Sequence, residues 1–258
     1  MSDINIDHLS GITHIIFNRP QARNALTFEM YDKIQDVCTE ANTNGGIRAI
    51  VFAGADASAF AAGTDISLLR SIVSGKDGIN YEERIEHVVG AVERCRVPTI
   101  AAIAGACTGG GAALATACDL RIGAANMKFG YPMARTLGNC LSLANCARLS
   151  SLIGPGRFKD LLFTARLMGP EEAYAAGLIR EIVDEPEEVL SRAHHLADLI
   201  IQHAPLTIRA VKEALLRISA QLHSVGFSDV IEQCYESEDF RLGVDSFMKK
   251  ETPNWSGH

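Results

Sequence analysis

Two stretches of very small residues stand where backbone groups, rather than side chains, are in a position to do chemistry. The first is FAAGTDISLL at Phe60–Leu69, and the second is GACTGGGAALA at Gly105–Ala115. Each follows a short apolar run typical of a buried strand and precedes a segment typical of a helix. Because a helix N-terminus leaves backbone N–H groups unpaired and carries a partial positive charge, both stretches suit an anion or a developing oxyanion.

Each stretch taken alone also fits simple packing, since small residues let a helix approach a strand closely. The triplet Gly109–Gly111 does not belong to a dinucleotide-binding GxGxxG motif, and no Lys-Ser/Thr pair follows it as in a phosphate-binding P-loop. Taken together, two strand–turn–helix units that present bare backbone N–H groups can form a two-donor oxyanion hole.

Alternating apolar runs and helical patterns must position these stretches. Five segments are expected to be strands, at 11–18, 47–54, 99–104, 119–124 and 178–183, and the three middle ones are expected to be buried. Helices are expected at 27–42, 65–74, 82–95, 112–117, 187–203 and 206–222. The alternation predicts an α/β fold with a helical tail, arranged as a core at 1–195 and a C-terminal helical region at 196–258 of one domain.

The composition of the chain indicates which binding partners and which cellular compartment to expect. The chain has 258 residues, 47 % of them hydrophobic, and a formal net charge of -7 without a basic patch, so we expect no nucleic-acid partner. Seven cysteines without a CxxC motif favour a reducing cytoplasm over disulfides or a zinc cluster, and we expect no metal. The N-terminus lacks the pattern of a signal peptide, and no apolar run predicts a membrane span, so we expect a cytoplasmic protein without a membrane partner.

The same two stretches carry a resemblance to a known family. FAAGTDI resembles the F-x-A-G-A-D-I signature of the crotonase, or enoyl-CoA hydratase/isomerase, family, and IAGACTGGGAALATACDLRIGA resembles its second, glycine-rich signature. Further matches are NRPQARNALT, KFGYP, PEEAYAAGLIREIV and SEDFRLGVDSFMKKETPNW, in the family's order along nearly the whole chain. The resemblance implies a spiral of ββα units with a helical C-terminal region that builds homotrimers, often paired into hexamers.

The resemblance also implies an acyl-CoA substrate and a set of site residues. The thioester carbonyl is expected between the backbone N–H groups of Ala62 and Gly110, which stabilise an enolate-like oxyanion. No cofactor is implied beyond the coenzyme A that the substrate carries. The residues that the resemblance assigns to substrate and CoA binding are Arg23, Ala25, Ala62, Asp65, Ile66, Gly110, Phe247 and Lys250.

Two departures from the family pattern bear on the reaction. Hydratases of the family position a water molecule with two glutamates, and the matching positions here hold Ala113 and Met133. Neither side chain can exchange a proton, and general acid–base catalysis commonly contributes about 10²–10⁴-fold. We therefore expect weak or absent hydration.

Polar residues near the same pocket are candidates for another chemistry. Thr64 matches a position where decarboxylating relatives place a polar residue, and Ser142 lies near the single acid of some isomerases. Arg135 is either a carboxylate clamp or a surface or intersubunit arginine. Cys140 is either a nucleophile or, lacking a histidine partner, a small hydrophobe.

Two hypotheses from different classes remain. The first is an enzyme of the hydratase/isomerase family that stabilises a thioester enolate and acts as a decarboxylase, lyase or isomerase. The second is a non-catalytic acyl-CoA-binding protein that serves assembly or sensing, since loss of both acids also fits a chain that has lost its activity.

Overall fold

The apolar runs form the strands of a six-stranded sheet. The computed structural model describes residues 2–220 and 226–257. The sheet contains β1 (Ile4–Leu9), β2 (Ile12–Phe17), β3 (Ala49–Gly54), β5 (Thr99–Ile103), β7 (Leu120–Ala124) and β9 (Ile182–Val183). These strands lie side by side in the order given; β1 pairs antiparallel with β2, and every other pair is parallel.

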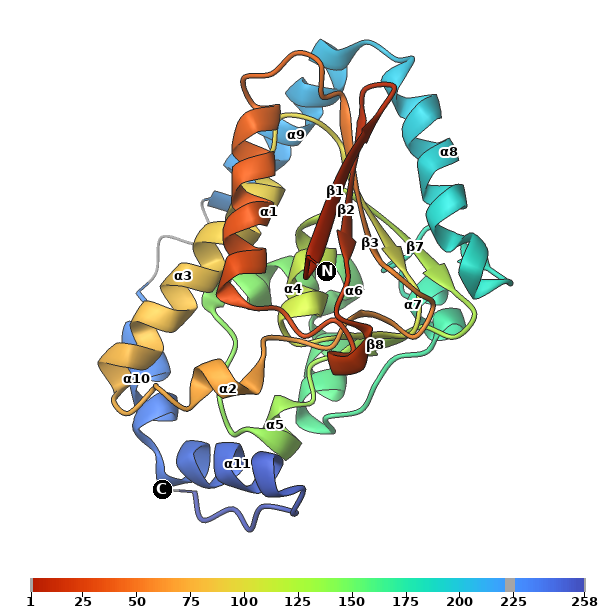
Figure 1. The fold of residues 1–258 in the computed structure, drawn as a ribbon. Helices are drawn as coiled ribbons and strands as arrows, with labels where there is room; N and C mark the ends of the chain where they lie inside the picture. Colours follow the sequence, from red (N-terminus) through yellow and green to blue (C-terminus); the bar gives the residue numbers. More distant parts are fainter. Residues whose placement is uncertain (1, 221–225, 258) are drawn as a thin grey trace.

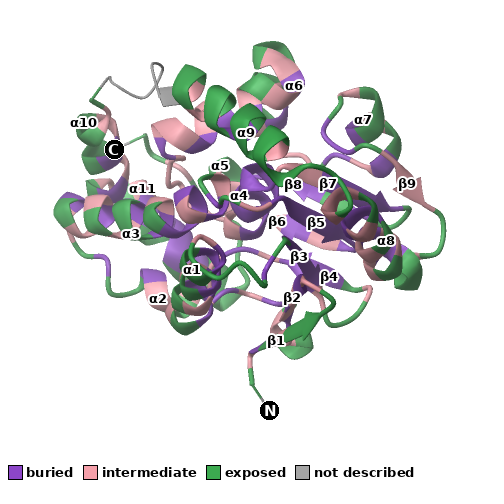
Figure 2. Ribbon diagram, turned by 90° about the horizontal axis from the view of Figure 1, so that it is seen from above, coloured by how far each residue is buried: buried purple, intermediate pink, exposed green. Residues whose placement is uncertain are grey.

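Both faces of this sheet are covered, which explains its continuous apolar runs. Every residue of β5 is buried. Alternate side chains point to opposite faces: Ile100 packs toward α8 (Val189–Ile201), and Ile103 packs toward α1 (Phe28–Ala41) and α3 (Gly75–Glu93). The helices on the two sides are seen in Figure 1, and the buried strands between them in Figure 2.

A second, three-stranded parallel sheet continues from the carboxyl ends of the first. It consists of β4 (Ala59–Ala61), β6 (Ala106–Thr108) and β8 (Lys128–Gly130). The chain passes from β3 to β4, from β5 to β6 and from β7 to β8, and helices follow each pair. These repeated ββα turns confirm the predicted crotonase-like α/β architecture.

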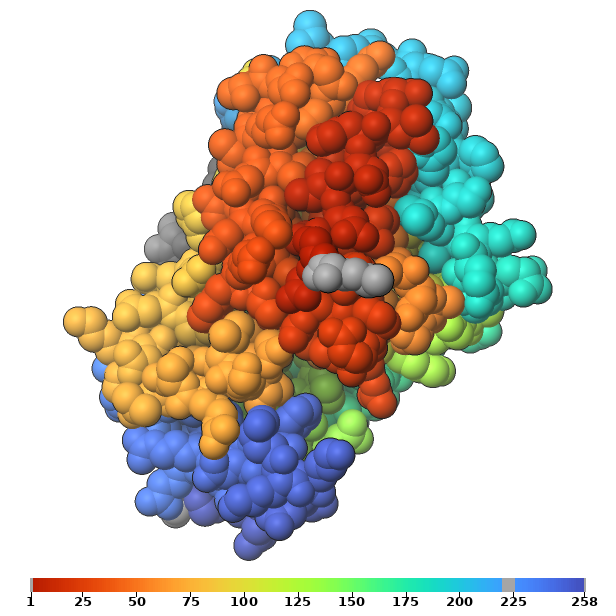
Figure 3. Space-filling view, viewed as in Figure 1, coloured from red at the N-terminus to blue at the C-terminus, as the bar shows by residue number. Residues whose placement is uncertain are grey.

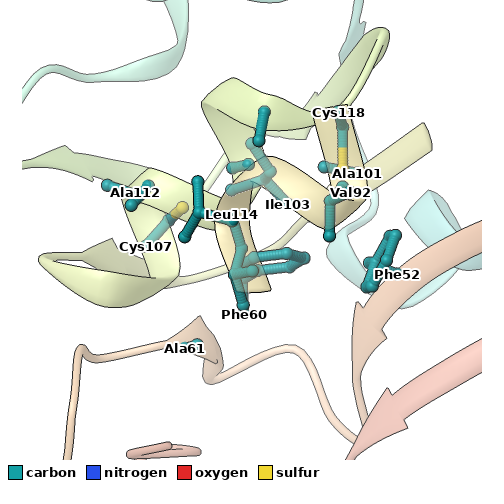
Figure 4. Packing of buried hydrophobic residues seen from close by; sticks show 14 of the residues in the cluster. Phe52, Phe60, Ala61, Val92, Ala101, Ile103, Cys107, Ala112, Leu114 and Cys118 are labelled. Carbon is teal, nitrogen blue, oxygen red and sulfur yellow. The ribbon is translucent and has the colours of Figure 1, made fainter. Parts of the chain in front are cut away.

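The core between the two sheets and the helices is tightly packed. Phe60 of β4, Ile103 of β5 and Leu114 of α4 (Gly110–Ala117) belong to one fully buried cluster (Figure 4). A Cβ atom on Gly111 would overlap with the Ala61 carbonyl, so the glycine lets α4 approach β4. The small residues therefore do serve packing, as one of the two interpretations held.

The remaining helices surround this frame. They are α2 (Ile66–Leu69), α5 (Met133–Thr136), α6 (Leu143–Phe163), α7 (Pro170–Ala175), α9 (Pro205–Ala220), α10 (Ser228–Glu236) and α11 (Glu238–Lys249), with 3-10 turns at Pro20–Ala22 and Pro186–Glu188. Gly154 and Pro155 kink α6. Figure 3 shows the C-terminal helices, in blue, against the segment that holds α2 and the start of α3. No helix within the described residues is long and apolar enough to cross a bilayer.

Several predicted boundaries need correction. The division between residues 195 and 196 falls inside α8, which packs on the large sheet, so the core extends to the end of that helix. The helix expected at 65–74 is only the short α2, and α3 begins at Gly75 because Ser74 and Asp77 form a capping box there. The expected end of the 206–222 helix lies outside the described residues.

Candidate active site

The two small-residue stretches meet at the ends of neighbouring strands. β4 and β6 pair in parallel, with Ala61 opposite Cys107, so the residues that follow both strands lie side by side. Gly63 has a φ of +106°, which favours glycine. A Cβ atom on Gly63 would lie only 3.5 Å from the Thr108 carbonyl oxygen and 3.8 Å from the Gly110 nitrogen.

The backbone N–H of Ala62 is already occupied. It donates a hydrogen bond to the Arg23 carbonyl oxygen at 3.0 Å. The prediction that Ala62 supplies a free oxyanion donor is therefore wrong, although the residue does line the cavity described below.

Thr64 presents the backbone donor instead. Thr64 forms a parallel bridge with Leu26, in which the Leu26 N–H donates to Gly63 and the Asp65 N–H donates to Leu26. In such a bridge the flanking peptide groups carry the hydrogen bonds, so the Thr64 N–H points to the opposite side, toward α4. A Cβ atom on Gly110 would lie 3.4 Å from the Thr64 nitrogen.

Gly110 supplies a second backbone donor at the same place. It is the first residue of α4, and a first-turn N–H has no intrahelical acceptor. The preceding Gly109 has a φ of +51°, and its own N–H donates to Gly130 at 3.1 Å. The structure thus brings the N–H groups of Thr64 and Gly110 together beside one cavity.

This cavity has a volume of about 600 Å³. Eight residues predicted for catalysis or for substrate binding line it, namely Arg23, Ala25, Ala62, Thr64, Asp65, Ile66, Gly110 and Phe247. Ala113 and Met133 line it as well, so the positions at which the resemblance leads us to expect glutamates do face this cavity. Cavities of 300–1,000 Å³ are typical of small-molecule sites.

Three predicted residues lie elsewhere. Arg135 is exposed on α5 and does not line the cavity. The hydroxyl of Ser142 caps α6 by accepting a hydrogen bond from the Asn145 N–H at 3.2 Å, so its side chain serves the helix end. Lys250 is exposed at the C-terminal cap of α11, outside the cavity lining that includes Phe247.

A cluster of three hydroxyl groups surrounds the Thr64 side chain. The Tyr81 hydroxyl donates to Thr64 Oγ1 at 2.9 Å, and the Tyr31 hydroxyl lies 2.9 Å from the same atom. Burial raises the pKa of both tyrosines above the ordinary value, so both keep their protons. Two hydrogen bonds use two of the three hydroxyl hydrogens, and no third acceptor is found among the described residues. When Tyr31 also donates to Thr64 Oγ1, the hydrogen of Thr64 is the one left over, and Thr64 lines the cavity.

The sequence did not point to Glu82, which also lines the cavity. It is buried, with 7 % of its surface exposed, and its Oε1 accepts a hydrogen bond from the Tyr235 hydroxyl at 2.5 Å. Burial raises the pKa of Glu82 to about 7, while the Tyr235 hydrogen bond lowers it and the Glu86 charge raises it. Its burial could have been predicted from the helical spacing, since Glu82 falls on the same face of the helix as the buried Ile85 and Val89.

Cys140 lines the same cavity, but its surroundings are those of a thiol that only fills space in the core. It is half-buried among the apolar residues around Tyr235 and Phe240. The Cys234 thiol beside it and burial both raise the pKa of the Cys140 thiol. A raised pKa suppresses the thiolate, which favours the small-hydrophobe interpretation over a nucleophile. Over residues 2–220 and 226–257, His, Cys, Asp and Glu side chains form no group that could hold a metal ion.

Comparisons with known proteins agree with this geometry. The sequence profile of the enoyl-CoA hydratase/isomerase family matches residues 7–258. Crotonyl-CoA hydratase of Syntrophomonas wolfei is 31 % identical over 245 residues, covering 93 % of this chain and 93 % of that protein. An enoyl-CoA isomerase/hydratase of Mycosarcoma maydis is 30 % identical over 261 residues, covering 96 % of this chain and 94 % of its own.

A solved structure extends the likeness to three dimensions. Methylmalonyl-CoA decarboxylase in complex with 2-nitronate-propionyl-CoA aligns with all of this chain and 99 % of its own, at a TM-score of 0.88 and 27 % identity. Since the family profile covers nearly the whole chain and its relatives match over nearly their full length, this chain belongs to the enoyl-CoA hydratase/isomerase, or crotonase, family.

Proposed function

We propose that the chain is an acyl-CoA enzyme that stabilises a thioester enolate with the backbone N–H groups of Thr64 and Gly110. The observation that carries this proposal is the approach of these two N–H groups beside one cavity, since neither has an acceptor among the described residues. Each donor is worth about 2.7–4 kcal/mol of transition-state stabilisation in comparable sites. The relatives named for crotonyl-CoA and methylmalonyl-CoA chemistry support a CoA thioester as the substrate.

The choice of reaction class follows from the absence of carboxylates at positions 113 and 133 of the cavity wall. Ala113 and Met133 cannot position and activate a water molecule as a pair of carboxylates does. A decarboxylation or lyase step draws mainly on the oxyanion hole, because the departing group leaves its electron pair on the enolate. Isomerisation needs one proton-transfer group and is the other reaction compatible with this wall.

CoA itself is expected beside Arg23 and Phe247, two exposed residues that line the cavity. Arg23 lies in a turn with a φ of +50°, next to the backbone that holds Ala62. A guanidinium group at this place suits the phosphate groups of CoA.

We also propose that the protein assembles into trimers or hexamers. α9 exposes Val211, Leu215 and Ile218 along one face, with 57–63 % of their surfaces accessible. That face borders an apolar hollow of about 660 Å³ that reaches Thr116–Arg121. Exposed apolar patches of this kind mark interfaces between chains.

The test measures turnover on a panel of acyl-CoAs that includes crotonyl-CoA and malonyl-type thioesters, alongside binding by calorimetry. We expect decarboxylation, cleavage or isomerisation of one panel member, with little hydration of crotonyl-CoA. Hydration at a rate typical of relatives contradicts the argument from Ala113 and Met133. Binding without any turnover favours the non-catalytic alternative, and absence of acyl-CoA binding contradicts both.

A further inference from the structure

Glu82 is a buried carboxyl group whose position the family signatures do not explain. It lies on α3 between Tyr81 and Ile85, and all three residues line the acyl-CoA cavity. Tyr81 reaches the Thr64 hydroxyl, so this part of α3 borders the oxyanion hole directly. The carboxyl group therefore belongs to the same cavity wall as the proposed enolate site.

Only one of the two carboxyl oxygens of Glu82 accepts a hydrogen bond from the described residues. Oε1 accepts from the Tyr235 hydroxyl at 2.5 Å. The described residues donate no hydrogen bond to Oε2. The Asn139 amide donates to the Tyr235 hydroxyl at 3.3 Å and also lines the cavity, so a short chain of hydrogen bonds holds the carboxyl group in place. Fixed on one oxygen and open on the other, the group is arranged for a ligand.

A second hollow lies on the other side of Glu82. It has a volume of about 520 Å³ and is lined by Glu83, Glu86, His87 and Ser142, among others. Of the described residues that line the two cavities, Glu82 alone lines both. The carboxyl group thus separates the acyl cavity from a hollow that opens to solvent.

We propose that Glu82 carries the proton between the acyl α-carbon and water, taking the place of carboxylates that Ala113 and Met133 do not supply. This rests on the proposed function, because it requires an acyl-CoA whose carbonyl lies between Thr64 and Gly110. In the forward step the α C–H bond breaks and a new O–H bond forms on Glu82. The electron pair of the broken bond passes into the enolate, whose oxygen accepts hydrogen bonds from the backbone N–H groups of Thr64 and Gly110.

The return step completes the balance. Glu82 as the acid gives its proton to the α-carbon, or to the carbon that carries the charge after a leaving group departs. Between the two steps the acid exchanges its proton with water through the outer hollow. No oxidant, reductant or metal takes part in the cycle.

The groups around Glu82 tune it for this exchange. From α3 itself, Glu86 contributes a negative charge that Arg148 on α6 partly neutralises. From α10, the Tyr235 hydroxyl stabilises the ionised form by its hydrogen bond, whereas Cys234 disfavours that form. With a pKa of about 7, the carboxyl group is divided between acid and base at neutral pH, which is the condition for efficient proton transfer.

A purely structural role makes a different prediction. If Glu82 only tethers α10 to α3, its single requirement is an acceptor for the Tyr235 hydroxyl. A glutamine meets that requirement at the same size, since its amide oxygen accepts the same hydrogen bond. Glu82→Gln therefore separates proton transfer from tethering.

The experiment follows deuterium incorporation at the α-carbon of butyryl-CoA in D₂O by proton NMR. The proteins are the unmodified chain, Glu82→Gln and the matched control Glu171→Gln, which removes an exposed charge on α7, outside both cavities. Butyryl-CoA affinity and thermal unfolding are measured for each. We expect exchange by the unmodified chain and by Glu171→Gln, and a loss of about 10²-fold or more in Glu82→Gln at unchanged affinity.

A second variant probes the titration. Tyr235→Phe removes the hydrogen bond that favours the ionised carboxylate, so the midpoint of the exchange rate against pH should move upward from about 7. An unmoved midpoint contradicts Glu82 as the titrating group, as does exchange by Glu82→Gln at the unmodified rate. Butyryl-CoA binding without exchange by the unmodified chain overturns this proposal alone, whereas absence of binding overturns the proposed function too.

Discussion

The hydroxyl group of Tyr31 occupies the space that a Cβ atom on Gly110 would need. Tyr31 is fully buried on α1 and is hydrogen-bonded to Thr64, so it has little freedom to withdraw. A side chain from a helix remote in the sequence thus excludes every residue but glycine from the start of α4. The Cβ position that Tyr31 blocks also lies 3.4 Å from the Thr64 nitrogen, so a side chain at position 110 would reach both oxyanion donors.

Gly110→Ala should therefore disrupt the site. The added methyl group collides with Tyr31 and pushes α4 away from Thr64, and overpacking of this kind commonly costs about 1–3 kcal/mol. We expect lower thermal stability and strongly reduced turnover. Adding Tyr31→Phe removes the colliding oxygen and should restore most of the stability. If the double variant is no more stable than Gly110→Ala, the collision is not the cause.

The hydroxyl cluster makes a separate prediction. Thr64→Val keeps the shape and the backbone N–H but leaves the Tyr31 and Tyr81 hydroxyls without their partner, which costs about 1–3 kcal/mol of unfolding free energy. The substitution also removes the Thr64 hydroxyl hydrogen, which is available to a bound substrate. Turnover should fall by about tenfold for each 1.4 kcal/mol of transition-state stabilisation that this hydrogen provides. Thr64→Ser keeps the hydroxyl, and steady-state kinetics should place it near the unmodified chain.

Glu82 should also make the free energy of unfolding depend on pH. Its pKa is raised from 4.5 to about 7, so between these values the folded chain holds a proton that the unfolded chain has released. The unfolding free energy must then fall as pH rises through this window, by an amount on the order of 3 kcal/mol. Urea unfolding at several pH values should show this fall in the unmodified chain. Glu82→Gln should lack it, and an identical pH dependence in both proteins contradicts the assignment.

Restoring carboxylates at the two substituted positions should move the reaction toward hydration. Ala113→Glu combined with Met133→Glu places two ionisable groups on the cavity wall. We expect crotonyl-CoA hydration to rise by about 10²-fold, measured from the loss of enoyl absorbance. The glutamine pair at the same positions matches the size without the ionisation. An equal gain in the glutamine pair would show that cavity shape, not proton transfer, limits hydration.

The exposed face of α9 predicts the oligomeric state. Val211→Glu with Leu215→Glu places charges on the apolar face, which should dissociate the trimer or hexamer in light scattering coupled to gel filtration. Arg209→Glu reverses a charge on the opposite face of the same helix and should leave the assembly intact. A monomeric unmodified chain contradicts the proposed assembly outright.

Continuous apolar strands were readily predicted from the sequence, whereas very short ones were not. The runs at 47–54 and 99–104 are rich in β-branched residues or bounded by breakers, and they form β3 and β5. The three-residue strands β4, β6 and β8 carry too few side chains for a period of two to be visible. The family resemblance, and not periodicity, anticipated their place in a ββα spiral.

The choice between Ala62 and Thr64 illustrates the limit of local sequence. Both residues sit in one small-residue turn, and either N–H fits a donor on the basis of sequence alone. Which of them is free depends on pairing with Arg23 and Leu26, some forty residues earlier in the chain. Glu82 was missed for a related reason, because only the folded chain places that turn of α3 against the cavity.

That pairing has a consequence for how the substrate is gripped. The segment from Arg23 to Leu26 is joined to Ala62, Gly63 and Asp65 by three backbone hydrogen bonds of 2.8–3.0 Å. The CoA moiety and the thioester carbonyl would therefore contact two segments that these hydrogen bonds join. Binding energy from the CoA moiety can then help to position the carbonyl between its two donors, and in this way it can raise the rate of the chemical step.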